Sequence, residues 1–171
     1  MIKNSIGTKF ANNTEITSLR ELKYFGVVNM GTNWLRNNSN LTYVEMPFAM
    51  RNFGQIENPR AGLKIVFNEG YTTGTYSMFN QCGSKKLVLD FPSTLTDWSN
   101  GSIWRNSGSS LPTLIFRGNV GNFSNLKSNT NGGQLATAIY VPDQYYESYY
   151  EYLAGYTNQS RLHRLSEYAE G

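Results

Sequence analysis

The sequence predicts a repeat solenoid in which short parallel strands, one for every ~22–25 residues, form one sheet. Five apolar segments recur at nearly constant spacing. Their central residues are Val44, Val66, Leu89, Leu114 and Ile139. A weaker sixth copy lies one period upstream of Val44, around Leu19. One short strand in each period of about 20–29 residues is typical of leucine-rich-repeat-like folds, and the class is α/β or mainly β.

A second pattern precedes the strands and stays in phase with them. An aromatic residue lies six or seven positions before four of the strands, as Phe10, Trp34, Phe79 and Trp104. A small polar residue or a thiol lies four positions before them, as Asn12, Asn37, Cys82 and Ser107. We expect the aromatic ring to fill each turn and the small side chain to satisfy backbone groups at the bend. Cys82, the only cysteine, is therefore assigned a structural role.

The chain is expected to form one domain with three regions. Residues 1–25 hold the weak first copy, and the spacing of Ile16, Leu19, Leu22 and Phe25 suits a short helix and an irregular cap equally well. Residues 26–142 form the solenoid. Its third period is irregular, because the stretch from Asn58 to Gly62 stands where the aromatic and small polar residues belong, which makes the register around residues 50–62 the least defined.

The sequence of the last region, residues 143–171, predicts a cap at the end of the solenoid. Pro142 ends a strand, Asp143 is a suitable N-cap, and Glu147 places a negative charge near the helix start. An apolar stripe at helical spacing follows, formed by Tyr146, Tyr149, Tyr150 and Leu153. We expect a helix at 143–154 that closes the open end of the sheet, with one more extended piece in RLHRLSEY.

Composition excludes several classes of function. The chain has 171 residues, 15 basic and 12 acidic, for a net charge of +3, and no run of Lys or Arg exceeds two. Such a scattered charge argues against nucleic acid as the main partner. No apolar stretch reaches the ~18 residues of a membrane span, and the N-terminus carries no signal-peptide pattern, so export would need another sequence or route.

Three stretches resemble the BspA-like leucine-rich repeat family, found on secreted and surface proteins of gut and oral anaerobes and in proteins of their phages. They are NTEITSLRELKYF, NLTYVEMP and IYVPDQYYESYYEYLAGYTNQSRLHRLSEY, and the similarity extends over roughly residues 8–168. The resemblance implies a parallel-strand solenoid used for adhesion or recognition, located at the cell surface or secreted. It brings no catalytic residues with it.

Strand residues that point away from the core are the candidate binding residues. If the central residue of each strand faces inward, its neighbours face outward along a concave sheet. The predicted rows are Tyr43, Ile65, Val88, Thr113, Ala138 and Glu45, Phe67, Asp90, Ile115, Tyr140. From these we select Tyr43, Glu45, Phe67, Asp90, Ile115 and Tyr140 as a candidate ligand-binding set. The same side chains would equally serve to stack on one another.

The sequence favours a binding module over an enzyme. His163 is the only histidine and lies near the C-terminus, and a glycosidase pair of Glu45 and Asp90 would have no pocket around it. No metal-ligand cluster and no cofactor motif is present in the sequence. We therefore expect adhesion to a host or bacterial surface protein or glycan. The alternative is a structural or receptor-binding component of a phage virion.

Overall fold

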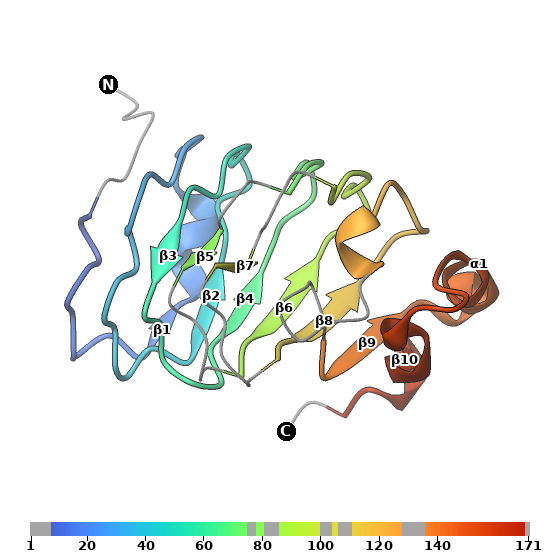
Figure 1. Cartoon of the computed structure of the whole chain (residues 1–171). Helices are drawn as coiled ribbons and strands as arrows, with labels where there is room; N and C mark the ends of the chain where they lie inside the picture. Colours follow the sequence, from blue (N-terminus) through green and yellow to red (C-terminus); the bar gives the residue numbers. More distant parts are fainter. Residues whose placement is uncertain are drawn as a thin grey trace.

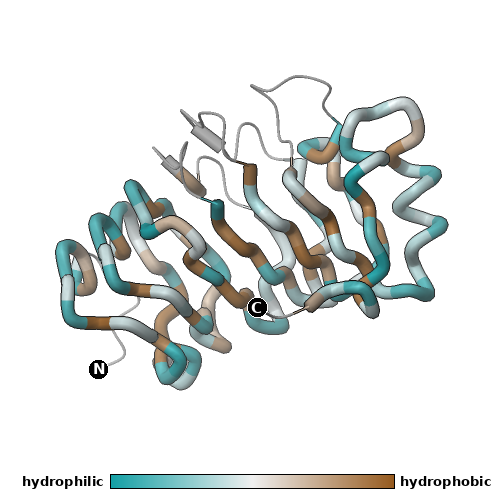
Figure 2. Tube along the Cα trace, turned by 90° about the horizontal axis from the view of Figure 1, so that it is seen from below, coloured by the Kyte–Doolittle hydropathy of each residue, from teal (hydrophilic) through white to brown (hydrophobic). Residues whose placement is uncertain are grey.

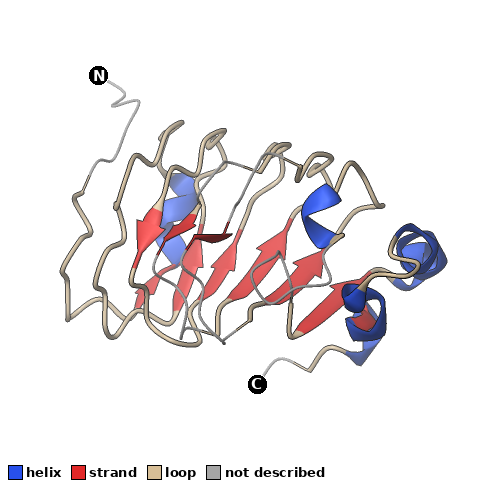
Figure 3. Ribbon diagram, viewed as in Figure 1, coloured by secondary structure: helices blue, strands red, loops and turns tan. Residues whose placement is uncertain are grey.

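A seven-stranded parallel sheet is the largest element of the computed structural model, which describes residues 8–74, 78–80, 86–99, 104–105, 111–127 and 136–169 (Figure 1). Its strands lie side by side in chain order, as Figure 3 shows. They are β1 (Ser18–Leu19), β2 (Tyr43–Glu45), β4 (Lys64–Val66), β6 (Val88–Phe91), β8 (Thr113–Phe116), β9 (Ala138–Val141) and β10 (Leu162–Arg164). The prediction of short parallel strands in one sheet is confirmed.

A second parallel sheet is formed by segments that lie between the strands of the first. Its three strands are β3 (Ile56–Glu57), β5 (Phe79–Asn80) and β7 (Trp104–Arg105). Isolated parallel bridges, such as Asn29 with Asn52 and Thr73 with Asp97, extend the same pattern. Buried residues of both sheets, among them Val44 and Phe79, belong to one hydrophobic cluster. From β2 to β8 the chain therefore passes alternately through the two sheets, which share one core.

The strand register differs by one position from the prediction in β4. Val44 pairs with Ile65, not with Val66, and Ile65 in turn pairs with Leu89. The winding from Tyr43 to Lys64 is shorter than the next one, which runs from Lys64 to Val88. The apolar run LKIVF offers two alternations, and the structure buries the one containing Leu63, Ile65 and Phe67. A slip of a single position moves every side chain to the opposite face.

The third winding also carries the small polar residue that the sequence was expected to lack there. Asn12, Asn37 and Asn58 each lie six positions before a strand and adopt positive φ angles of 59°, 56° and 46°. Their side chains form a ladder, because Asn37 Nδ2 donates to Asn12 Oδ1 at 2.9 Å and Asn58 Nδ2 donates to Asn37 Oδ1 at 2.8 Å. Asparagine tolerates this left-handed conformation better than most residues.

Of the four aromatic landmarks, Trp34 and Phe79 are buried, Phe10 is only partly buried, and the side chain of Trp104 lies outside the described residues. Trp34 and Phe79 have no exposed surface, and Ile56, which pairs with Phe79, takes the equivalent place in the third winding. Cys82 and Ser107, to which we assigned structural roles, lie outside the described residues. The prediction of a turn-filling aromatic therefore holds at Trp34, whereas Phe79 is buried in the strand β5 and not in a turn.

A row of aromatic rings runs through the core beneath the large sheet. Phe67, Phe91 and Phe116 occupy equivalent positions in β4, β6 and β8 or directly after them, and their ring centroids lie 4.8 and 5.4 Å apart. Tyr149 continues the row at 5.9 Å from Phe116. Figure 2 shows hydrophobic segments gathered along these strands. Stacked aromatic rings of this kind bury large apolar areas and stabilise the fold.

The C-terminal cap is helical but is not entered as predicted. A 3-10 helix, η3 (Asp143–Tyr145), leads into α1 (Tyr146–Tyr152). The Asp143 carboxylate does not cap the helix and instead accepts hydrogen bonds from the Ser166 amide and hydroxyl at 3.2 and 2.7 Å. Tyr149 and Leu153 are fully buried, whereas Tyr150 is 44% exposed and therefore lies outside the predicted buried stripe.

Four further 3-10 helices complete the described elements: η1 (Arg20–Tyr24), η2 (Ser124–Leu126), η4 (Thr157–Arg161) and η5 (Leu165–Glu167). Of the two alternatives for the N-terminal segment, the structure has a short helix of the 3-10 type. The strand expected in RLHRLSEY is β10, which adds to the sheet beside β9. The same hydrophobic cluster extends from Leu22 to Leu162.

Candidate functional site

The face of the large sheet that points away from the core carries two rows of side chains, and we call it the outer face. The strand pairing places in these rows Tyr43, Lys64, Val88, Thr113, Ala138 and Glu45, Val66, Asp90, Ile115, Tyr140. Lys64 and Val66 occupy the positions that the sequence analysis gave to Ile65 and Phe67. The other eight positions agree with the prediction.

Phe67 is the one candidate residue that does not lie on the outer face. It is 3% exposed, and its ring contacts those of Phe53, Tyr71 and Phe91 at 4.8–5.1 Å between centroids. The prediction was wrong because the short third winding shifts the strand by one position. Phe67 therefore contributes to the core.

At the β1 and β2 end of the outer face, four polar residues form a connected group that we call the charged cluster: Arg20, Lys23, Tyr43 and Glu45. Glu45 is its centre. Its carboxylate accepts hydrogen bonds from Arg20 at 3.1 Å and from the Tyr43 hydroxyl at 2.9 Å, and it pairs with Lys23 Nζ at 2.7 Å. The Arg20 guanidinium also lies 4.3 Å from the centroid of the Tyr43 ring. The cluster thus presents an aromatic ring stacked with a cation.

The charged cluster shifts the pKa of its own members. Burial raises the pKa of Tyr43, and the hydrogen bond to Glu45 raises it further, to about 12. Burial alone would raise the pKa of Glu45, but hydrogen bonds from Lys23 and Tyr43 and the charge of Arg20 outweigh burial and lower it. The hydrogen bond to Glu45 raises the pKa of Lys23. At neutral pH the carboxylate, the two cations and the neutral phenol therefore stabilise one another.

Asp90 and Arg117 form the next polar group along the face. Arg117 donates to both carboxylate oxygens of Asp90, from Nε at 2.8 Å and from Nη2 at 2.7 Å, and Asp90 is only 4% exposed. Asp90 lies in the same row as Glu45, two strands away, as predicted. Both carboxylates are engaged by cations, and the lowered pKa of Glu45 is the opposite of what a general acid needs.

At the β8 to β10 end, aromatic rings cover the outer face, and we call this region the covered end. The Tyr140 ring lies 5.2 Å from the His163 ring and 4.9 Å from the Tyr168 ring. Ile115 points outward beside them but has no exposed surface. Tyr168 comes from the segment after β10, which turns back across the sheet, and Lys64 Nζ of β4 lies 5.6 Å from its ring (Figures 1 and 2).

His163 does not belong to an arrangement of nucleophile and base in the described part of the chain. Its Nδ1 lies 3.4 Å from a carboxylate oxygen of Glu167, and both side chains are about half exposed. Among the residues that the structure describes, no group of three or more His, Cys, Asp and Glu side chains could hold a metal ion. Within the same residues, no helix is both long and apolar enough to span a bilayer.

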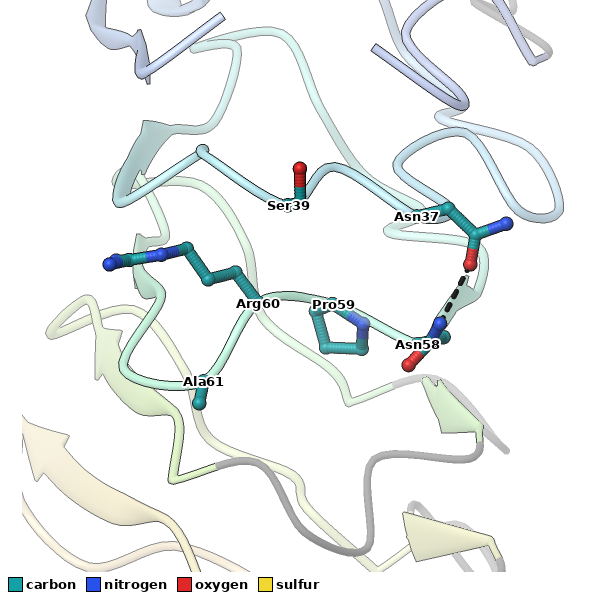
Figure 4. A pocket seen from close by; sticks show the side chains of 6 residues that line it. All are labelled: Asn37, Ser39, Asn58, Pro59, Arg60 and Ala61. Atoms are coloured by element: carbon teal, nitrogen blue, oxygen red, sulfur yellow. Dashed lines mark hydrogen bonds between the residues drawn. The ribbon is translucent and has the colours of Figure 1, made fainter. Parts of the chain in front are cut away.

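Two hollows are present among the described residues, and the sequence analysis anticipated neither. The first, of about 270 Å³, lies beside the asparagine ladder, with Asn37, Asn58 and Arg60 among its lining residues (Figure 4). The second, of about 410 Å³, adjoins β1, and its lining includes the apolar Phe10 and Phe25 as well as Arg20 of the charged cluster. The recurrence of asparagine at equivalent positions is the signal from which the first hollow could have been inferred.

Comparison with known proteins gives no match: no protein family, no curated protein and no solved structure is significantly similar to this chain. The function is therefore inferred from the geometry of the outer face.

Proposed function

We propose that this chain is a leucine-rich-repeat solenoid of the BspA-like type that acts as a non-enzymatic module and binds a protein or a glycan on its outer face. Successive parallel strands in chain order, a core shared by two sheets and an asparagine ladder support the solenoid. Stacked windings of this kind create extended surfaces that suit recognition. The proposed location is the cell surface or the extracellular space.

The charged cluster is the observation that carries the binding proposal. Arg20 has 58% of its side chain exposed, yet it is held in place by Glu45 and by the Tyr43 ring. Side chains that are already fixed lose little entropy on binding. The Tyr43 ring offers a flat surface for a sugar ring or an apolar side chain, and the guanidinium offers donors to hydroxyl, carbonyl or carboxylate oxygens.

A screen of glycan and protein arrays with two variants tests the proposal. The wild-type chain is compared with Arg20→Ala/Tyr43→Ala and with Tyr156→Ala, which alters an exposed tyrosine away from the outer face. We expect ligands that bind the wild type to bind Tyr156→Ala equally and to lose at least tenfold in affinity for the double variant. Thermal unfolding of both variants serves as the folding control.

Equal binding by the wild type and by both variants would show that the ligand does not bind on the outer face. No binding by the wild type would favour the alternative role, a structural component of a phage particle. In that case the charged cluster would act only to stabilise the sheet.

A further inference from the structure

We propose that the covered end of the outer face is a docking site for a short peptide bearing an acidic residue next to a tyrosine, and that the chain's own Tyr168 is its resident occupant. This inference deepens the proposed function, on which it rests, by naming the chemistry of a partner. It also implies that the partner must displace the segment Leu165–Glu167 and Tyr168 in order to bind.

The position of Tyr168 indicates that its ring occupies a site on the outer face and does not belong to the hydrophobic core. Its ring packs edge-on against Tyr140 at 4.9 Å and lies 5.6 Å from Lys64 Nζ, so it bridges β9 and β4 across the outer face. Ile115 lies on a strand between them and has no exposed surface, although it is not part of the core cluster. The Tyr140 ring and the Lys64 cation thus lie against one phenol ring, and the buried Ile115 lies on a strand between those that carry them.

The polar contacts that hold the segment in place involve mostly exposed side chains, and its ring contacts are those of Tyr168 with Tyr140 and Lys64. Ser166 donates two hydrogen bonds to Asp143, and Glu167 lies 3.4 Å from His163, and all of these side chains except His163 are exposed. Exposed pairs of this kind contribute little to stability. Residues 165–169 pair with no strand of the described sheet. The segment can therefore leave the face while β9 and β10 stay paired.

The charges around the site select the partner. The occupant presents Glu167 directly before Tyr168, and the face offers Lys64 to the ring and His163 to the carboxylate. A short peptide that has an acidic residue directly before a tyrosine, and that can adopt the 3-10 turn of the resident segment, matches the cation Lys64 in sign of charge.

A peptide with the sequence LSEYA, residues 165–169 of this chain, is the probe, and LSEAA is its control. Each peptide is titrated into full-length wild type and into Tyr168→Ala while the methyl resonances of Ile115 and Val66 are followed by NMR. We expect LSEYA to shift both resonances of Tyr168→Ala at millimolar concentration, as befits a site normally filled from within the chain. The wild type should need at least fivefold more peptide, and LSEAA should have no effect.

The Tyr140→Ala/Tyr168→Ala variant should lose the response, and Tyr156→Ala should behave as the wild type. Equal shifts in wild type and Tyr168→Ala, or no shift in Tyr168→Ala, would overturn the inference.

If Tyr168→Ala fails to fold, hydrogen exchange of the wild type decides. Exchange at residues 165–169 at least tenfold faster than in β9 supports a displaceable segment, and equal protection refutes it. Array ligands that bind wild type and Tyr168→Ala equally would refute this inference alone and leave the proposed function standing.

Discussion

The two ends of the outer face share one backbone arrangement and differ in almost everything else. At β1 and β2, the face carries Arg20, Lys23 and Glu45, held by ion pairs with partly exposed side chains. At β8 to β10 it carries the buried Ile115 and also Tyr140, whose ring packs against those of His163 and Tyr168. One end is fixed by charge and remains open to solvent, and the other is apolar and is closed by the chain itself.

This difference shows that the arrangement of parallel strands does not determine which kinds of side chain lie on the outer face. Equivalent positions in successive strands hold a carboxylate in Glu45, an aliphatic chain in Val66 and an aromatic ring in Tyr140. Ion pairs, which salt can screen, hold the charged side chains of a surface in place. Apolar side chains must instead be covered from water. The predictions that follow separate these two modes of stabilisation.

The largest effect is expected in the core beneath the covered end. Phe116→Ala removes a fully buried ring that contacts Phe91, Phe123 and Tyr149, and should lower the free energy of unfolding by about 3–5 kcal/mol. Phe48→Ala, which truncates a ring that is 53% exposed, should lower it by less than about 1 kcal/mol. Urea denaturation measures both. Similar losses in the two variants would contradict the assigned core.

A smaller effect is expected in the middle of the face, where Asp90 is nearly as buried as the core. Asp90→Ala removes two hydrogen bonds from Arg117 and should cost about 2 kcal/mol, because the partly exposed arginine can regain water. Arg117→Lys keeps the charge but loses the paired geometry, so it should fall between wild type and Asp90→Ala in urea midpoint. An unchanged urea midpoint in Asp90→Ala would show that the pair of Asp90 and Arg117 contributes no more to stability than a weak surface contact does.

The charged cluster should make stability depend on acid pH. The pKa of Glu45 in the folded state lies below its ordinary value of about 4.3, so its contribution is complete above that value. The contribution disappears as the pH falls through the lowered folded pKa. Wild type should therefore exceed Glu45→Gln in unfolding free energy by about 1 kcal/mol at pH 6, and the difference should shrink below pH 4. A constant difference from pH 7 to pH 3 would show that Glu45 titrates normally.

The sequence predicted the pattern of strands well, because side-chain burial with a period of two leaves a direct mark on it. Val44, Leu89, Leu114 and Ile139 are central residues both in the prediction and in the structure. The error at Phe67 arose where the apolar run LKIVF satisfies both alternations and the winding is short. Only the pairing of β4 with its neighbours decides between them.

The candidate site was less predictable than the fold, since it depends on contacts between residues far apart in the chain. The sequence placed Tyr43, Glu45 and Tyr140 on the outer face, and the strand pairing agrees. It gave no sign that Tyr168 would return to pack against Tyr140. A turn after β10 determines this, and turns of single 3-10 segments leave no periodic pattern.

The smallest effect on stability is expected where Ser166, in the segment after β10, bonds to Asp143. This prediction best distinguishes the two ends of the outer face. Ser166→Ala removes the hydroxyl's hydrogen bond to Asp143, a contact in which both side chains are exposed, so the melting temperature should change by less than about 2 °C. Hydrogen exchange should nevertheless quicken at residues 165–168 and stay unchanged in β2, since the charged cluster does not depend on the segment. A matched Ser160→Ala variant, whose hydroxyl bonds only within η4, should leave both regions unchanged. If Ser166→Ala lowers the melting temperature strongly, the segment after β10 is an integral part of the fold, and the contrast between an open and a self-covered end of the outer face disappears.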